Sequence, residues 1–332
     1  MPNPSAVLRR FAGQKLLIVG DVILDRYWWG EASRLSPEAP VPVVRKQSAT
    51  VRPGGAANTA ANLAALGATP LLVGLVGNDR AAVELQGALL ECGVAVDSLI
   101  AENARPTTTK TRIVASHQQI VRVDEEDTAA MPREAEERAR AVIAKGLELT
   151  NAVVVSDYAK GFLTPSLLKF LTAAAARAGQ RVFVDPKGAD CTRYQGCFLM
   201  KPNRLELSIL TGLPARNHRE TLAAGSRLSA LMPGAMILVT EGADGMTLFG
   251  GASPVEHLAH APRQVYDVTG AGDTVLATLA LAMTAGASYR DAMELAAEAA
   301  AIAIGTMGTA TVTLPQLEAA FHASTQPKEN AG

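Results

Sequence analysis

The chain has 332 residues, of which 48% are hydrophobic and 19% are charged, so it can bury a large core and lacks the composition of a disordered protein. Its 31 Lys and Arg nearly balance its 32 Asp and Glu, giving a formal net charge of −1, which argues against a surface built to hold nucleic acid or anionic lipid. We therefore expect a small ligand.

The number of cysteines and the lack of long apolar segments indicate in which cellular compartment the protein is expected. Cys92, Cys191 and Cys197 are odd in number and lack the short paired spacings of a zinc site, so neither a disulfide framework nor a zinc site is expected. The N-terminus has no long apolar region, and no later run of about 18 apolar residues is free of charge, glycine or proline. These features predict a cytoplasmic protein that does not cross a membrane.

Short apolar runs alternate with helical patterns along most of the chain. In chain order we predict a strand at Leu16–Gly20, a helix at Ala56–Leu66, a strand at Leu71–Val76, helices at Ala81–Cys92 and Arg133–Leu149, a strand at Ala152–Val155, a helix at Leu167–Ala178, strands at Val182–Val184 and Phe198–Met200, a helix at Arg219–Leu231, a strand at Met236–Val239, and buried helices at Ala271–Ala285 and Tyr289–Ile304. This alternation predicts an α/β fold with a mostly parallel sheet and helices on both faces. Ligands should gather at the carboxyl ends of its strands.

Two segments break this alternation. Ala39–Val51 and Thr107–Val123 alternate polar and apolar residues and are rich in β-formers. They are expected to pair as a small antiparallel sheet that serves as a lid, a dimer surface or both, although a meander covering one sheet edge fits the same pattern. We expect residues 1–324 to form one domain and residues 325–332 to be a polar tail.

The most informative segment is Asp267-Val-Thr-Gly-Ala-Gly-Asp273, which leads into an apolar helix. Gly270 and Gly272 permit a tight turn, and the unpaired N–H groups from Gly270 through Ala271 to Gly272 lie at the positive end of the helix dipole. Such an anion hole can stabilise a phosphoryl group in transfer. Asp273 can accept the proton of an attacking hydroxyl. A plain loop with Asp273 as its N-cap fits the same residues.

A second glycine motif, Gly54-Gly-Ala-Ala-Asn58, opens the helix predicted at Ala56–Leu66. Gly54 and Gly55 would let a sugar hydroxyl approach the backbone, and Asn58 offers both a donor and an acceptor. A solvated turn with an N-cap is the alternative.

Two motifs later in the chain are candidates for the nucleotide. In Lys201-Pro-Asn203-Arg-Leu-Glu206, the side chains of Asn203 and Glu206 lie three residues apart and could hold a hydrated Mg²⁺ beside ATP. Capping of a helix explains the same spacing.

The other nucleotide candidate is Val239-Thr-Glu-Gly-Ala-Asp-Gly245, a turn after a predicted strand. Thr240 would offer its hydroxyl to a phosphate, and Gly242 and Gly245 would leave room for it. A plain β-turn remains an alternative.

The chain resembles the ribokinase-like (PfkB) sugar kinases. The motif at 54–58 is similar to their N-terminal signature, the motif at 267–273 is similar to their C-terminal signature, and the two occur in the same order. The resemblance implies a three-layer ribokinase-like fold with a small β-sheet lid and the use of ATP. It also implies that Asn203 and Glu206 serve Mg²⁺ and phosphate, and Lys201 of the same motif is a further candidate for binding the nucleotide. A requirement for a monovalent cation stays open.

Further segments make the resemblance more specific within this family. Those at 19–30 (VGDVILDRYWWG), 33–42, 107–112, 156–161 (SDYAKG) and 185–188 (DPKG) resemble D-glycero-β-D-manno-heptose 7-phosphate kinases over roughly residues 10–320. This implies phosphorylation of the anomeric C1 hydroxyl of heptose 7-phosphate to the 1,7-bisphosphate, for ADP-heptose and lipopolysaccharide core synthesis.

A phosphorylated sugar needs hydroxyl-binding and phosphate-binding groups. Asp21, Asp25 and Asp185, within the resembled motifs, are candidates for the sugar. The basic residues of these motifs and their neighbours are candidates to hold the fixed phosphate, although each alone fits a solvated surface charge: Lys110, Arg112, Arg122, Lys160 and Lys187.

The sequence departs from forms of the resembled family in which a nucleotidyltransferase domain follows the kinase. After Thr325 there is no His-x-Gly-His-type loop, so adenylyl transfer is not expected of this chain. Rival interpretations are a kinase of the fructose phosphate type or for an unphosphorylated sugar, an inactive sugar-binding sensor and, more distantly, a nicotinamide-dependent oxidoreductase. A homodimer through the lid strands is expected, because their apolar face needs cover.

Overall fold

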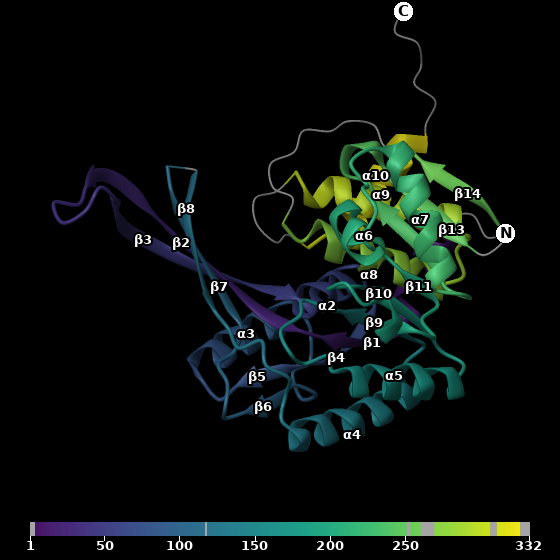
Figure 1. Ribbon diagram of the computed structural model, residues 1–332. Coiled ribbons are helices and arrows are strands. Elements are labelled where there is room, and N and C mark those ends of the chain that lie inside the picture. Colours follow the sequence, from purple (N-terminus) through teal and green to yellow (C-terminus); the bar gives the residue numbers. More distant parts are fainter. Residues whose placement is uncertain (1–3, 117, 251–252, 260–268, 306–310, 326–332) are drawn as a thin grey trace, which may run out of the picture.

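The computed structural model describes residues 4–116, 118–250, 253–259, 269–305 and 311–325 (Figure 1). Its largest sheet has eight strands, and six of them run parallel in the order β12-β11-β10-β9-β1-β4, with β13 and β14 added antiparallel beyond β12. The strands are β1 (Lys15–Gly20), β4 (Thr69–Val73), β9 (Ala152–Ser156), β10 (Arg181–Asp185), β11 (Leu199–Met200), β12 (Met236–Thr240), β13 (Met246–Gly250) and β14 (Ser253–Leu258). The mostly parallel sheet expected from the sequence is confirmed.

Helices cover both faces of this sheet. One layer contains α2 (Ala56–Ala65), α8 (Ala271–Thr284), α9 (Tyr289–Ala303) and α10 (Leu314–Thr325), and the other contains α4 (Arg133–Leu149), α5 (Pro165–Arg177), α6 (Arg204–Thr211) and α7 (His218–Leu231). Strand β1 shows why its residues are all apolar: Leu16 and Ile18 belong to one core and Leu17 and Val19 to the other. This is the three-layer arrangement expected from the sequence. The short α1 (Pro4–Leu8) also lies against the first layer, and α3 (Arg80–Glu91) packs beside the smaller sheet.

A smaller four-stranded sheet reaches away from the helix-flanked body, as Figure 1 shows. Its order is β3-β2-β7-β8, with β2 (Val22–Leu35), β3 (Pro42–Gly55), β7 (Thr109–Ala115) and β8 (Gln118–Glu125). The pairs β2–β3 and β7–β8 are antiparallel, and β2–β7 is parallel. We call this sheet the lid.

The lid differs from the sequence expectation in that the two expected segments do not pair with each other, since β2 lies between β3 and β7. The strand expected at Ala39–Val51 begins at Pro42 and continues to Gly55, and the segment at Thr107–Val123 forms two strands, not one. The largest difference is the strand β2, which was not predicted from the sequence. It is buried at its inner end and exposed at its tip, so its side chains do not keep one alternating pattern.

The strand predicted at Leu71–Val76 is also wrong as a single element. It divides at Gly74 into β4 and β5 (Leu75–Gly77), and β5 pairs with β6 (Ile100–Glu102) in a separate sheet. A Cβ at Gly74 would meet Val22 Cγ1 at 2.6 Å, so the start of β2 presses on the chain here. An apolar run does not reveal where a chain leaves one sheet for another.

The three cysteines are free thiols, as expected. Among the helices of the described ranges, none combines the length and apolarity that crossing a bilayer requires.

Candidate active site

The glycine-rich motif forms the start of α8. Asp267 and Val268 lie outside the described residues. Gly270 is the N-cap and adopts φ 80°, a left-handed conformation that favours glycine. The helix then begins at Ala271, Gly272 lines a cavity of about 290 Å³, and Asp273 lies in the first turn with only 2% of its surface exposed. The helix N-terminus and its carboxylate therefore lie together, as the sequence predicted.

Side chains from two other elements hold the Asp273 carboxylate. Asn58 on α2 donates from Nδ2 to Oδ2 at 2.8 Å, and the Tyr158 hydroxyl donates to Oδ1 at 2.8 Å. The Thr59 hydroxyl lies 3.4 Å from Oδ1. Asn62 Nδ2 donates to the backbone oxygen and to Oδ1 of Asn58, at 3.0 and 3.2 Å, and so orients that amide. The two glycine motifs, far apart in sequence, thus meet at one carboxylate.

This environment changes the acidity of Asp273. Burial raises its pKa to about 7, the charge of Asp185 acts in the same direction, and the hydrogen bonds from Asn58 and Tyr158 and the charge of Lys201 oppose the rise. A carboxylate that titrates near neutral pH can accept a proton from a hydroxyl and release it again at little cost. The geometry and the acidity both fit a general base.

The 290 Å³ cavity opens at the carboxyl ends of four neighbouring parallel strands, β9 to β12. Its lining is polar and consists of Asp157, Tyr158, Asp185, Lys187, Lys201, Asn203, Glu206, Thr240 and Gly272. Two ion pairs form among these lining residues, since Lys201 Nζ lies 3.1 Å from Asp185 Oδ2 and Lys187 Nζ lies 3.0 Å from Glu206 Oε1. The carboxyl edge of the sheet is where a ligand was expected.

The pair of Lys201 and Asp185 is deeply buried. Burial raises the pKa of Asp185 to about 6 against the pull of Lys201. Burial alone would lower the pKa of Lys201, but the charges of Asp185 and Glu206 outweigh it and raise that pKa. Lys201 is therefore a fixed positive charge beside the N-terminus of α8.

Asn203 and Glu206 form a capping box at the start of α6. Asn203 Oδ1 accepts from the Glu206 N–H at 2.9 Å, and Glu206 Oε2 accepts from the Asn203 N–H at 3.0 Å. The capping that the sequence left as an alternative is thus present. Both side chains also line the cavity, so capping and contact with a ligand are compatible.

The segment after β12 turns as expected. Thr240 lines the cavity, Gly242–Asp244 forms a short 3₁₀ turn, and the Glu241 N–H donates to the Gly245 carbonyl at 2.8 Å. Gly242 and Gly245 both adopt positive φ. Of this motif, the threonine is the residue brought to the cavity wall.

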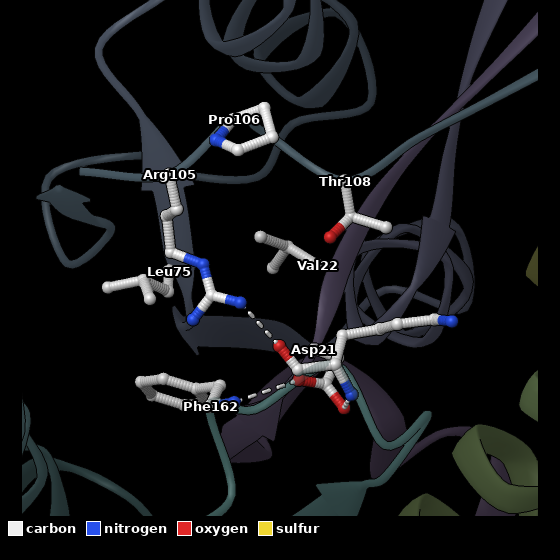
Figure 2. Close-up of a pocket in the computed structure, with 8 residues that line it drawn as sticks. Asp21, Val22, Leu75, Arg105, Pro106, Thr108 and Phe162 are labelled. Carbon is white, nitrogen blue, oxygen red and sulfur yellow. Dashed lines mark hydrogen bonds between the residues drawn. The ribbon is translucent and has the colours of Figure 1, made fainter. Parts of the chain in front are cut away.

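Asp21 lies away from the large cavity, and the backbone of the next loop surrounds it. Its carboxylate accepts from the N–H groups of Tyr158, Lys160 and Phe162 at 2.8, 3.1 and 3.3 Å. Figure 2 shows it beside Phe162 and Arg105 at a cavity of about 10 Å³, room for about one water molecule. In this structure Asp21 clamps the loop at 157–162, and its binding of sugar hydroxyls stays a prediction.

Asp25, on the lid strand β2, pairs with Arg112 on the neighbouring lid strand β7. Arg112 Nη1 lies 2.5 Å from Asp25 Oδ1, and a Cβ at Gly54 would come 2.5 Å from Asp25 Oδ2. Gly54 therefore gives the carboxylate the space it occupies. At the neighbouring Gly55, φ is 57°, where the chain turns from β3 into α2.

Most of the basic candidates gather at the inner end of the lid. Lys110 Nζ lies 3.1 Å from Asp124 Oδ2, Arg122 Nε lies 2.8 Å from Asp124 Oδ1, and Lys160 Nζ lies 2.7 Å from Glu126 Oε1. We call these five residues the lid-base cluster. Lys187, by contrast, lies in the 290 Å³ cavity.

Sequence reasoning missed two features. Tyr158 lies inside the SDYAKG segment but was given no role, because nothing in the segment shows that its hydroxyl reaches α8. The second feature is a group formed by His218, Glu241 and His257, whose potential ligand atoms lie within 4.8 Å of one another. Glu241 already accepts hydrogen bonds from Arg204 at 2.9 Å and from Thr247, so the group is satisfied without an ion.

The fold, the helix N-terminus and the polar cavity together define a carbohydrate kinase. A family model described as pfkB family carbohydrate kinase matches residues 14–317, and the chain belongs to that family. It is a phosphotransferase that acts on a sugar hydroxyl, and the family uses ATP with a divalent cation.

Curated relatives and solved structures agree with this assignment. The chain is 44% identical over 324 residues to the bifunctional protein HldE of Caulobacter vibrioides, covering 97% of this chain and 66% of that protein. It is 42% identical over 313 residues to HldE of Klebsiella pneumoniae, covering 94% and 64%. The chain thus spans a little less than two thirds of these relatives.

Two solved structures show the same fold. Arabidopsis thaliana ribokinase complexed with ribose and ATP has a TM-score of 0.73 at 24% identity, covering 95% of this chain and 99% of that one. Phosphofructokinase-2 from Escherichia coli in complex with potassium has a TM-score of 0.78 at 18% identity, covering 94% and 99%.

The cavity has donors that suit a divalent cation. Hard cations take oxygen ligands and often keep several waters. Asn203, Glu206 and Thr240 provide an amide oxygen, a carboxylate and a hydroxyl on one cavity wall, and the three carboxylates of the lining outnumber its two lysines. The residues present therefore fit a hydrated divalent cation.

Proposed function

We propose that this protein transfers the γ-phosphoryl group of Mg-ATP to the anomeric C1 hydroxyl of D-glycero-D-manno-heptose 7-phosphate, giving heptose 1,7-bisphosphate for ADP-heptose and lipopolysaccharide core synthesis. The observation that carries the kinase chemistry is the buried Asp273 carboxylate at the N-terminus of α8, beside the polar cavity. The heptose substrate is supported by the motif resemblance and by the 44% identity to an HldE protein.

The residues of the cavity suggest how the transfer proceeds. Asp273 accepts the proton of the sugar hydroxyl as that oxygen attacks the γ-phosphorus, and the bond from the γ-phosphorus to the β-phosphate oxygen breaks to release ADP. The N–H groups from Gly270 to Gly272 and the ammonium of Lys201 stabilise the negative charge on the transferring group. A bound divalent cation would neutralise further phosphate charge, with Asn203 and Glu206 holding it through water.

We propose that the lid-base cluster receives the distal phosphate of the sugar. Lys110, Arg122 and Lys160 carry three positive charges against the two negative charges of Asp124 and Glu126. One positive charge is therefore left over for a phosphate dianion, which can replace the carboxylates as a partner. Lys187 is assigned instead to the phosphates of the nucleotide, because it lines the 290 Å³ cavity and is not part of the lid-base cluster.

A substrate panel tests the proposal. ADP release is measured with heptose 7-phosphate, fructose 6-phosphate, mannose and ribose, and the phosphorylated position is read by ³¹P NMR. The expected result is the highest kcat/KM for heptose 7-phosphate with phosphate at C1. A preference for fructose 6-phosphate would reject the heptose assignment, and sugar binding without ADP release would indicate a sensor.

The base is tested by Asp273→Asn, with exposed Asp97→Asn as the matched control. Asp273→Asn should fold and bind ATP yet lose about 10²–10⁴-fold in kcat, the usual contribution of a positioned base. The control should retain wild-type turnover. Near-wild-type turnover by Asp273→Asn would reject the role of Asp273.

We further propose that residues 1–324 act as a single kinase domain in the cytoplasm and that the lid forms a homodimer contact. Support for the dimer comes from β8, an edge strand that exposes Ile120, Val121 and Val123, because exposed apolar edge strands favour pairing. Light scattering after size exclusion should give twice the chain mass, and Val121→Lys should reduce it. A monomeric wild-type protein would contradict the contact.

A further inference from the structure

The loop at 157–162 is held in an uncommon conformation. Ala159 has φ 54°, a left-handed value that a residue with a Cβ adopts at an energetic cost. The three N–H groups that Asp21 accepts fix the same loop, and Figure 2 shows the Asp21 end of this clamp. Backbone strain that the surroundings enforce is common at functional sites. This loop carries a side chain that contacts Asp273.

The loop presents Tyr158 to the proposed base. Its backbone N–H is bound to Asp21, and its hydroxyl donates to Asp273 Oδ1 at 2.8 Å. Tyr158 also lines the 290 Å³ cavity. One residue therefore links the clamp, the cavity and the carboxylate.

We propose that Tyr158 is a positioning residue for phosphoryl transfer, whose hydroxyl fixes the orientation of the Asp273 carboxylate and favours its ionised form. The inference rests on the proposed role of Asp273 as the base. Asp21 acts one step further back, because it fixes the backbone from which Tyr158 reaches α8.

Hydrogen-bond geometry supports this role. A carboxylate has about four acceptor sites. Asn58 takes one on Oδ2, while Tyr158 and, more weakly, Thr59 take those on Oδ1. Donors on both oxygens fix the rotation of the carboxylate and leave an acceptor site on Oδ2 for the sugar hydroxyl.

The charged surroundings of Asp273 identify what Tyr158 adds. Helix α2 contributes neutral Asn58 and Thr59, and the charges acting on Asp273 from β10 and beyond β11 are Asp185 and Lys201. Burial and then the charge of Asp273 raise the pKa of Tyr158 well above its usual value, so its phenol stays a donor. A donor to the ionised carboxylate lowers the pKa of that carboxylate.

The test is Tyr158→Phe, measured as kcat and kcat/KM against pH with heptose 7-phosphate. We expect the acid limb of the profile to move to higher pH, with a loss of tenfold or more at pH 6.5 that shrinks at pH 9, while the Kd for ATP is unchanged. A role limited to packing would lower activity by one factor at every pH, and that result would overturn the proposal.

Tyr194→Phe is the matched control. Tyr194 donates to the neighbouring carboxylate Asp157 at 2.6 Å and does not contact Asp273 in the described residues. Its acid limb should stay at the wild-type pH. An equal shift in this variant would mean that the effect belongs to the loop and not to the Tyr158 hydroxyl.

A second variant keeps both the ring and the hydroxyl, and it serves if Tyr158→Phe fails to fold. Replacing Tyr158 by 3,5-difluorotyrosine makes the phenol a stronger donor with nearly the same shape, so the acid limb should move to lower pH. No movement, or movement to higher pH, would overturn the proposal. Asp273→Asn, measured in parallel, separates the two claims: if it loses turnover while Tyr158 variants keep the wild-type profile, only the role of Tyr158 is lost.

Discussion

The carboxyl edge of the central sheet and the outer part of the lid carry their charged residues in opposite ways. At the carboxyl edge of the central sheet, Lys201 and Asp273 are each only 2% exposed, and burial and neighbouring charges set their pKa values. In the lid, the side chains of Arg45 and Glu31 pair while 76% and 48% exposed. Water and salt screen such pairs. The buried charges at the sheet edge are therefore held in place by their surroundings, whereas the exposed pair of the lid is only weakly coupled.

The largest stability effect should follow from Lys201→Met. It removes the partner of buried Asp185, and breaking a buried pair typically costs about 3–5 kcal/mol. Urea unfolding at pH 7.5 measures the change. A loss below about 1 kcal/mol would show that the buried pair behaves like a lid pair and would remove the contrast between the two regions.

Asp273→Asn should stabilise the fold while it lowers turnover. The pKa of Asp273 rises from 3.8 to about 7 on folding, so its proton favours the folded state below pH 3.8 and that advantage is lost as the pH rises to about 7. Asparagine stays neutral. The variant should exceed the wild type by up to about 4 kcal/mol at pH 8, at about 1.4 kcal/mol per pKa unit, and by much less at pH 4.5.

Urea unfolding at both pH values measures this difference. Equal stability of Asp273→Asn and wild type at pH 8 would mean that the carboxylate is not destabilised by its burial. The role of burial in making Asp273 a base would then be wrong.

Lys110→Met tests whether a lysine of the lid binds the phosphate of the sugar. Removing one phosphate partner should raise KM for heptose 7-phosphate about tenfold, equivalent to about 1.4 kcal/mol, with little change in KM for ATP or in Tm. Exposed Lys145 on α4 provides the control, since Lys145→Met should leave both KM values unchanged. An equal rise in KM for an unphosphorylated sugar would contradict the assignment of the lid-base cluster.

The smallest effect is expected for Arg45→Ala. Its pair with Glu31 is exposed, and such pairs contribute about 0–1 kcal/mol. Urea unfolding should give a change within that range, and the change should vanish at high salt. A loss as large as that of Lys201→Met would show that exposure does not separate the two regions.

The sequence was sufficient for the parts of the fold that depend on local pattern. Buried parallel strands such as β1 and β9 are continuous apolar runs, and the helices between them carry clear periodicity. Strand β2 was missed because its residues face the core at one end and water at the other, and the break at Gly74 depends on the contact with Val22. Both are consequences of packing between distant segments.

The same division holds for the site. Asp273 and Asn58 were identified from glycine motifs, because a helix N-terminus is a local feature. Their contact with each other, the hydrogen bond from Tyr158 and the engagement of Asp21 with a backbone loop all join residues more than 100 positions apart. Side-chain type alone did not show that the Asp21 carboxylate accepts hydrogen bonds from the backbone of this loop.

The connections that join β2 and β3 of the lid to the rest of the molecule are very short. Asp21 alone separates β1 from β2, and β3 ends at Gly55 immediately before α2. Any swing of the lid must therefore be absorbed by a very few backbone torsions, one of them at the residue that grips three amides. A swing of the lid would turn at Asp21, the same amino acid that anchors the Tyr158 loop, so a wide swing would strain the hold on the Asp273 carboxylate.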